Sequence, residues 1–128
     1  MKINYECIRD LLLYLEENLQ YDKDLSPNSL KLSQISASES LRKYSKQDIA
    51  YSSKMLKEAD YINATILNSD FMIIDIVYFE ITFSGHQYLE TIRNKKVWDL
   101  VKKKLLNSAG SLGFEIIKKV ATQIICSL

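Results

Sequence analysis

The strongest constraint in this chain is a change in the spacing of its apolar residues after Asp60. Before that point, small and apolar residues recur every three or four positions, which is the spacing of one helix face. These residues are Ile49, Ser53, Leu56 and Ala59. After it, the segments YINATIL and FMIIDIVYFEI alternate with a period of two and are rich in β-branched and aromatic residues. The pattern predicts a helix followed by a hairpin of two long strands, joined by the turn residues Asn-Ser-Asp.

A helical pattern also opens the chain. Apolar residues recur at spacings of four, three and four between Ile8 and Leu19, which predicts a helix from about Asn4 to Asn18. Residues 21–40 then contain the only proline, six serines and interleaved leucines. Because these apolar residues argue against a free linker, we expect a loop that contains a short strand near Leu30 to Ser33.

Two serines in the next segment have the spacing of helix caps. Ser38 can cap a short helix through Leu41 and Tyr44. Ser45, followed three residues later by an aspartate, approximates a capping box for the helix that precedes the hairpin. The segment therefore predicts two helices that are separated by a tight turn.

Three further helical patterns follow the hairpin, near residues 82–94, 96–107 and 112–127. Gly110 is suited to end the second of these helices, because glycine adopts the left-handed conformation that closes many helices. A helix, a short strand, a helix-turn-helix and a hairpin in this order predict an α+β, mostly helical fold. The order is that of a winged helix, here with additional C-terminal helices.

The size of the chain fits one globular domain. It has 128 residues, of which 47% are apolar and 26% are charged, enough to bury a core. We expect a single domain over residues 1–128, with the winged-helix core in residues 1–81 and a helical extension in residues 82–128. The sequence shows no transmembrane segment and no secretory signal, so we expect a cytoplasmic protein that does not bind membranes. Cys7 and Cys126 lack metal-ligand spacing, so we expect reduced thiols and neither metal nor cofactor.

Charge is distributed unevenly along the chain. Residues 1–92 hold 9 Lys and Arg against 14 Asp and Glu, whereas residues 93–128 hold 8 against 2. The last third is therefore the more suitable surface for a polyanion. Its basic run from Arg93 to Lys104 could contact phosphate, although a solvated helix face is the simpler interpretation of such a run.

The only histidine lies in a stretch that joins the last strand to a helix. Thr82 can cap this helix, with Ser84 and Gln87 as a competing capping box. Gly85 lies in the first helical turn, where it costs about 1 kcal/mol relative to Ala, so we expect a closely packed neighbour. His86 lacks the partners of a metal or catalytic site, so we interpret Thr82, Gly85 and His86 as a structural joint with a half-buried histidine.

The second helix of the predicted helix-turn-helix is where a DNA-binding protein places its base contacts. We expect its outward residues to contact bases and the nearby basic residues to contact phosphate. The candidates are Tyr51, Ser52 and Lys54 for bases, with Arg42, Lys43, Lys46, Lys102, Lys103 and Lys104 for phosphate. However, residues 39–60 carry 5 basic and 4 acidic side chains and the hairpin adds acids, so this half is nearly neutral.

Four segments of the chain resemble an uncharacterised bacterial and phage family, domain of unknown function 2513. They are IRDLLLYLEEN, YSKQDIAYSSKMLKEADYI, ITFSGHQYLETIRNKKVWDLVKKK and GSLGFEIIKKVAT. The chain departs from the family pattern at Ser52 and at Asp60, where a glycine usually precedes the hairpin. The resemblance implies a small winged-helix-like protein of prophages and their hosts, without an assigned activity or catalytic residues.

Two functions fit these observations about equally. The first is a phage- or prophage-associated, DNA-binding transcriptional regulator. The alternative is a protein interaction module on the same scaffold that acts on a host or phage factor. We do not expect an enzyme. The apolar stripes of the last two helices exceed what one small sheet can cover, so we also expect a homodimer.

Overall fold

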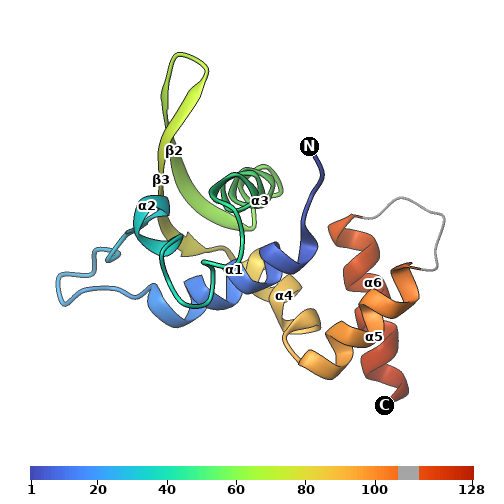
Figure 1. Ribbon diagram of the computed structural model, residues 1–128. Coiled ribbons are helices and arrows are strands. Elements are labelled where there is room, and N and C mark those ends of the chain that lie inside the picture. The colour runs from blue at the N-terminus through green and yellow to red at the C-terminus, as the bar shows by residue number, and fades with distance from the viewer. Residues whose placement is uncertain (107–112) are drawn as a thin grey trace. The chain divides into compact units, whose positions relative to one another are not determined.

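The computed structural model describes residues 1–106 and 113–128, and its fold is α+β (Figure 1). The described residues form six helices and one three-stranded antiparallel sheet. They divide into two compact units, Met1–Gly85 and His86–Leu128. The helix end that was predicted at Gly110 lies outside the described residues.

The first unit opens with α1 (Tyr5–Asn18), as the spacing predicts. The side chain of Asn4 caps the helix, because its Oδ1 accepts a hydrogen bond of 3.0 Å from the backbone N–H of Cys7. One face of α1 is fully buried, and it consists of Cys7, Ile8, Leu11, Leu12 and Leu15. This face forms one side of the core.

The short strand forms where the sequence indicates it, but the short helix does not. β1 (Leu30–Lys31) runs directly into α2 (Leu32–Ile35), whose first turn is closed by the Gln34 side chain accepting from the Lys31 N–H at 3.1 Å. The helix predicted from Ser38 to Tyr44 is wrong, because residues 36–44 form successive turns instead. The Ser38 hydroxyl is buried without a hydrogen-bond partner among the described residues, so it caps nothing.

The helix before the hairpin, α3 (Lys46–Glu58), confirms the predicted cap. The Ser45 hydroxyl accepts a hydrogen bond of 3.1 Å from the Asp48 N–H. After the C-cap Ala59, Asp60 has φ 60°, and the Tyr61 N–H bonds back to the Leu56 carbonyl at 2.9 Å. This left-handed conformation favours glycine and tolerates aspartate, so it explains why the chain can depart from glycine here.

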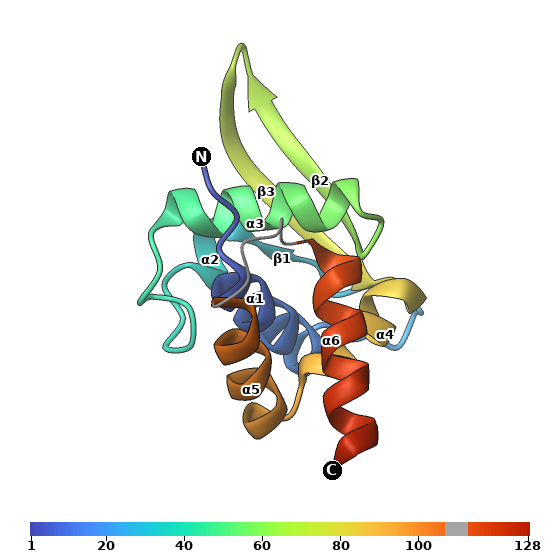
Figure 2. The ribbon, with the colours of Figure 1, turned by 90° about the vertical axis from the view of Figure 1, so that its right-hand side faces the viewer.

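The predicted hairpin is confirmed as β2 (Ile62–Ser69) and β3 (Met72–Ile81). Asp70 takes the left-handed conformation (φ 55°) in the turn between them. The sheet order is β1-β3-β2, with Leu30 opposite Tyr78 and Thr65 opposite Val77. Both views show the outer half of the hairpin rising past α3 as a two-stranded ribbon (Figures 1 and 2).

Helices and sheet enclose one core in the first unit. α1 packs against α3 and β3, α2 packs against β3, and α3 packs against β2. At the centre, the Ser53 hydroxyl donates to the Ile49 carbonyl at 2.7 Å and lies 2.5 Å from the Tyr78 hydroxyl. Because Ser53 has one proton and gives it to Ile49, the Tyr78 hydroxyl is the donor in that pair. Burial raises the pKa of Tyr78.

The stretch that joins β3 to the next helix is a close-packed joint, as predicted. The Thr82 hydroxyl accepts from the Gly85 N–H at 3.1 Å and donates to the Asp60 carbonyl at 2.6 Å. A Cβ on Gly85 would lie 2.0 Å from the Tyr61 carbonyl oxygen, so no other residue fits without moving backbone. Thr82 and Gly85 therefore fix where the sheet ends and the helix begins.

The second unit contains most of α4 (Phe83–Ile92), together with α5 (Lys95–Leu106) and α6 (Phe114–Ser127). α5 packs against α6, and the buried residues along these two helices include Val97, Val101, Ile117 and Ala121. The Tyr88 and Phe114 rings meet edge to face at 5.0 Å between centroids. Trp98 is buried, which agrees with a packing role.

The helices are all short or strongly amphipathic. Within residues 1–106 and 113–128, none is long and apolar enough to cross a membrane.

Candidate nucleic-acid interface

The outward side of α3 presents a row of polar side chains. Gln47, Tyr51 and Lys54 follow one another at spacings of four and three, so they share the face opposite the buried Ile49 and Leu56. Gln47 and Lys54 are exposed and Tyr51 is half-buried. We call these three residues the reading face. Gln47 was not among the predicted residues, although its spacing from Tyr51 and Lys54 would have identified it.

Ser52 does not lie on the reading face, so its predicted role in base contact is wrong. Its side chain is only 1% exposed. The inward stripe of α3 is wider than one row because both α1 and β2 cover the helix. Ser52 lies on the inner side, where its hydroxyl has no hydrogen-bond partner among the described residues, and burial raises the pKa of the nearby Cys7 thiol.

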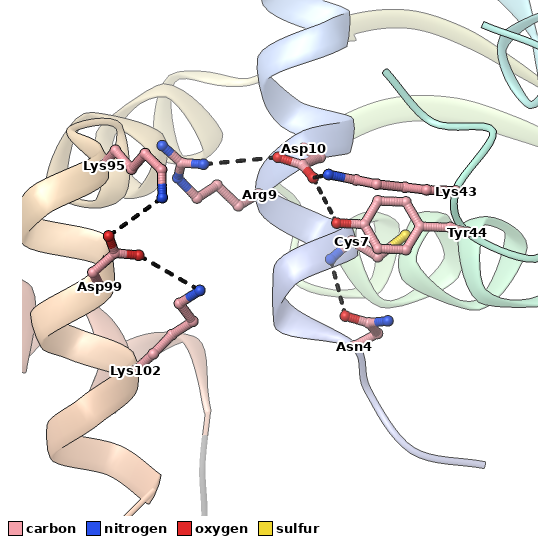
Figure 3. Close-up of polar contacts among 9 residues, drawn as sticks. All are labelled: Asn4, Cys7, Arg9, Asp10, Lys43, Tyr44, Lys95, Asp99 and Lys102. Carbon is pink, nitrogen blue, oxygen red and sulfur yellow. Dashed lines mark hydrogen bonds and ion pairs between the residues drawn. The ribbon is translucent and has the colours of Figure 1, made fainter. Parts of the chain in front are cut away.

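The turn before α3 carries two of the predicted cations and is tied to α1. The Tyr44 hydroxyl donates to Asp10 Oδ2 at 2.5 Å, and Lys43 Nζ lies 3.2 Å from the same oxygen (Figure 3). Burial and the hydrogen bond to Asp10 raise the pKa of Tyr44, because both favour the neutral phenol. Lys43 is thus partly neutralised, while Arg42 beside it is exposed.

Four cations around the reading face are free of acidic partners. Within the part of the chain that the structure describes, no carboxylate lies within 4.0 Å of their charged groups. They are Arg42, Lys46, Lys54 and Lys57, and all four are exposed. Lys57, in the last turn of α3, was not among the predicted residues. The acids Asp48 and Glu58 limit the net charge of the helix itself.

The hairpin has the opposite character. The chain carries no Lys or Arg between Lys57 and Arg93, so the hairpin has no cation for phosphate contacts. Large apolar side chains are instead exposed around its turn, and we call them the hairpin tip. They are Leu67 (42% exposed), Phe71 (105%), Met72 (72%), Ile73 (39%) and Ile74 (62%).

The middle of the hairpin is held to α2 by Asp75. Its carboxylate accepts from the Ser33 hydroxyl at 2.9 Å, the Ser33 N–H at 3.2 Å and the Ile76 N–H at 2.9 Å. Burial alone would raise the pKa of Asp75, but these hydrogen bonds outweigh burial and lower it. Asp75 therefore anchors the ribbon at the level where its free outer half begins.

The other predicted cations belong to the second unit. Lys102, Lys103 and Lys104 lie near the end of α5. Lys102 is half-buried and lies 3.6 Å from Asp99, which also pairs with Lys95 at 3.3 Å, whereas Lys103 and Lys104 are exposed. The structure brings Arg42, Lys43, Lys46, Tyr51 and Lys54 together in the first unit and the three α5 lysines together in the second.

His86 is exposed rather than half-buried, which corrects the prediction for this residue. Leu89 and Ile92, at spacings of three and six from His86, are fully buried. The helix presents them inward and leaves the imidazole outside. Among the described residues, no three His, Cys, Asp or Glu side chains are grouped as a metal site requires.

The fold and the site thus define an α+β protein in which a polar helix face lies beside a projecting hairpin. The chain belongs to the family described as "Hypothetical protein (DUF2513)", which matches residues 2–111. It is similar to an uncharacterized protein of Haemophilus influenzae (strain ATCC 51907 / DSM 11121 / KW20 / Rd), with 28% identity over 128 residues, covering 100% of this chain and 98% of the relative. No solved structure matches the chain.

Proposed function

We propose that the first unit is a winged helix that binds double-stranded DNA through α3, and that the protein acts as a cytoplasmic transcriptional regulator. The order α1, β1, α2, α3, β2, β3 and the sheet order β1-β3-β2 support this assignment. In this arrangement α2 and α3 correspond to the helix-turn-helix and the hairpin corresponds to the wing. The proposal is for binding rather than catalysis, because a convex helix face differs from the concave sites of enzymes.

The observation that carries the proposal is the reading face. Gln47 and Lys54 are side chains of the kinds that read adenine and guanine edges in the major groove. They lie on one face of a capped helix, with Tyr51 between them. Exposed cations at Arg42, Lys46 and Lys57 flank this face without ion-pair partners among the described residues, so they can contact phosphate.

The binding mode differs from that of a winged helix whose wing contacts the backbone. The hairpin lacks cations, so phosphate contacts come from α3 and the turn before it. With three to four such contacts, the slope of log K against log salt is about −3 to −4, since each neutralised phosphate contributes about −0.9.

Fluorescence anisotropy with duplexes from the native locus and of random sequence tests the proposal at two salt concentrations. Lys54→Glu should weaken binding at least tenfold, because it removes a base contact and repels phosphate. Lys23→Glu is the matched control, since it makes the same change of net charge at an exposed lysine outside α3. Equal losses in both variants would show only non-specific attraction and would contradict a reading role for α3.

The second candidate is a protein interaction module, and the hairpin favours it. A ribbon without cations and with five exposed apolar side chains is unsuited to DNA and suited to a protein surface. An affinity for DNA weaker than about 100 μM at 100 mM salt would fall outside the usual non-specific range and would select this candidate over DNA binding.

A further inference from the structure

The outer edge of the sheet is unusually open to pairing. Among the described residues, β2 pairs with β3 alone, so one edge of β2 has no strand beside it. Natural proteins protect such edges with lysine, proline, inward charges or a bulge. Residues 62–69 contain none of these side chains and carry no charge at all. The edge is therefore chemically able to accept another strand.

The two irregularities of the hairpin do not protect this edge either. Asn63 lies opposite Glu80 while Ala64 lies opposite Tyr78, so the extra residue, Phe79, belongs to β3. In the same way, the shift between Leu67 and Asn68 adds a residue to β3 only. Both bulges lie on the central strand and leave β2 continuous, so its free edge keeps a regular register.

The hairpin tip adds apolar area next to this edge. If a fully exposed large side chain has about 200 Å², the five residues together expose on the order of 600 Å². If both tips were covered completely, a pair of such surfaces would bury at most about 1,200 Å², which is the lower end of the range of specific interfaces. A two-stranded ribbon alone is marginally stable in water, so covering this part of the hairpin is favourable.

We propose that this surface pairs with a second copy of the chain, β2 against β2, to form a closed dimer with a continuous six-stranded antiparallel sheet. A twofold axis beside Leu67 places the two Leu67 side chains opposite each other. Each Asp70 then lies opposite Ala64 of the partner subunit. The two Asp70 carboxylates are about 20 Å apart along the strands, so their repulsion is largely screened.

Charge distinguishes a second copy from other occupants. Every residue of β2 is neutral, so antiparallel self-pairing in this register opposes no like charges along the strand. Anionic partners, such as nucleic acid or an anionic membrane, find no cation on the hairpin and one exposed acid, Asp70, in its turn. Two copies of this uncharged β2 edge can therefore pair without electrostatic repulsion between the strands.

This dimer surface differs from the one expected from the terminal helices. α5 packs against α6, and the stripe residues Val97, Val101, Ile117 and Ala121 are already buried in a single copy. Scattered residues such as Ile125 are left exposed on α6. Variants on the hairpin and on α6 can therefore separate the two surfaces.

The test is the molar mass of the protein, measured by sedimentation equilibrium without nucleic acid. The protein concentration is varied between about 1 and 100 μM, roughly the range in which dimers of this interface size dissociate. The unmodified chain should be dimeric at the upper end. Leu67→Lys should raise the dimer dissociation constant at least tenfold, because it places two ammonium groups at the twofold axis. Lysine at this position faces Asp75 across the hairpin, so the hairpin itself should stay folded.

Two matched variants serve as controls. Leu25→Lys changes an exposed leucine in the loop before β1, and Ile125→Lys changes an exposed residue of α6. Both should remain dimeric. A monomeric unmodified chain, or a dimer that survives Leu67→Lys but dissociates with Ile125→Lys, would overturn the proposal. Because DNA is absent from the assay, its result is independent of the proposed function.

A cross-link gives a second measurement that does not depend on weakening the dimer. Leu67→Cys and Thr65→Cys, each combined with Cys126→Ser, bracket the proposed register. Leu67→Cys should form a disulfide between copies under mild oxidation, since a disulfide needs Cβ atoms about 4 Å apart, whereas Thr65→Cys should not, because the proposed register separates the two copies of residue 65 by about 14 Å. Leu25→Cys in the same background should not. Failure of Leu67→Cys to cross-link would exclude the proposed β2 pairing.

Discussion

The reading face of α3 and the hairpin tip lie on the same unit but differ in surface chemistry. The reading face is polar, includes Lys54 and is flanked by three further cations without ion-pair partners among the described residues. The hairpin tip is apolar, and the hairpin has no Lys or Arg at all. Many winged helices use helix and wing together on DNA, whereas in the binding mode proposed for this chain only α3 and the turn before it supply cations.

This difference is the basis on which we propose separate roles for the two neighbouring elements. Phosphate attracts Lys and Arg, and the free energy of non-specific DNA binding comes mainly from such contacts. Apolar side chains gain free energy only when another surface removes them from water. The comparison therefore predicts that changes in α3 alter DNA affinity, while changes in the hairpin tip alter association between copies.

The largest effect should come from the joint that supports both elements. Gly85→Val should lower the free energy of unfolding by about 3 kcal/mol, because its Cβ would overlap the Tyr61 carbonyl oxygen. Both DNA binding and dimerisation should then fall together. Urea unfolding followed by circular dichroism measures the change, with His86→Gln, at an exposed site, as the control. Equal stability of the two variants would contradict the close approach at Gly85.

A smaller effect is expected at the tie between α1 and the turn before α3. Tyr44→Phe should cost about 1.5 kcal/mol of stability at pH 8, because it removes a hydrogen bond to a carboxylate. It should weaken DNA binding by disordering Arg42 and Lys43, and it should leave the dimer unchanged. A change in both activities would contradict the separation of the two surfaces.

The pH dependence of this variant has a definite sign. The pKa of Tyr44 is raised in the folded state. Its stabilising contribution is therefore complete below the pKa of the unfolded phenol, about 10, and is lost as the pH rises above that value. The difference in unfolding free energy between the unmodified chain and Tyr44→Phe should narrow from pH 8 to pH 11, roughly one unit above that pKa. A constant difference would contradict the raised pKa.

A gain of function should result from adding charge to the hairpin. Asp70→Lys should strengthen DNA binding about threefold and make the salt slope steeper by about one, if the hairpin turn approaches the backbone as a wing does. Asp22→Lys, in the exposed loop before β1, makes the same charge change elsewhere. If neither the affinity nor the slope changes for Asp70→Lys, the hairpin lies away from bound DNA.

The smallest effect on stability is expected at the hairpin tip itself. Phe71→Ser should change the unfolding free energy of the monomer by less than about 0.5 kcal/mol, because this side chain is fully exposed. Tyr78→Phe, further along the same strand, should cost about 1 kcal/mol through the lost bond to Ser53. Thermal melts at low protein concentration compare the two. A large loss with Phe71→Ser would show that the hairpin tip is buried within one copy.

The sequence by itself determined the elements that depend on local chemistry. Ser45 and Thr82 cap helices through hydrogen bonds to residues three positions later, so these caps depend only on the local sequence. The change of apolar spacing after Asp60 likewise separates helix from strand without reference to distant residues. Gly85 signalled a close approach, because a glycine in a helix is costly unless a neighbour needs the space. In the same way, spacing identifies Tyr51 and Lys54 as one face of α3.

Tertiary structure alone decided how wide each buried face is and which elements stay uncovered. By its position in the sequence, Ser52 lies beside the inward stripe of α3 rather than within it. It is buried only because α1 and β2 both cover α3. Ser38 has a capping side chain, but residues 36–44 form turns, and Leu41 is buried in the core from a turn rather than from a helix. The apolar residues of β3 read as one continuous strand, yet Ile76 and Tyr78 are buried while Met72 and Ile74 are exposed. The reason is that periodicity reports the direction of a side chain, whereas its burial depends on how far the neighbouring elements reach along the strand.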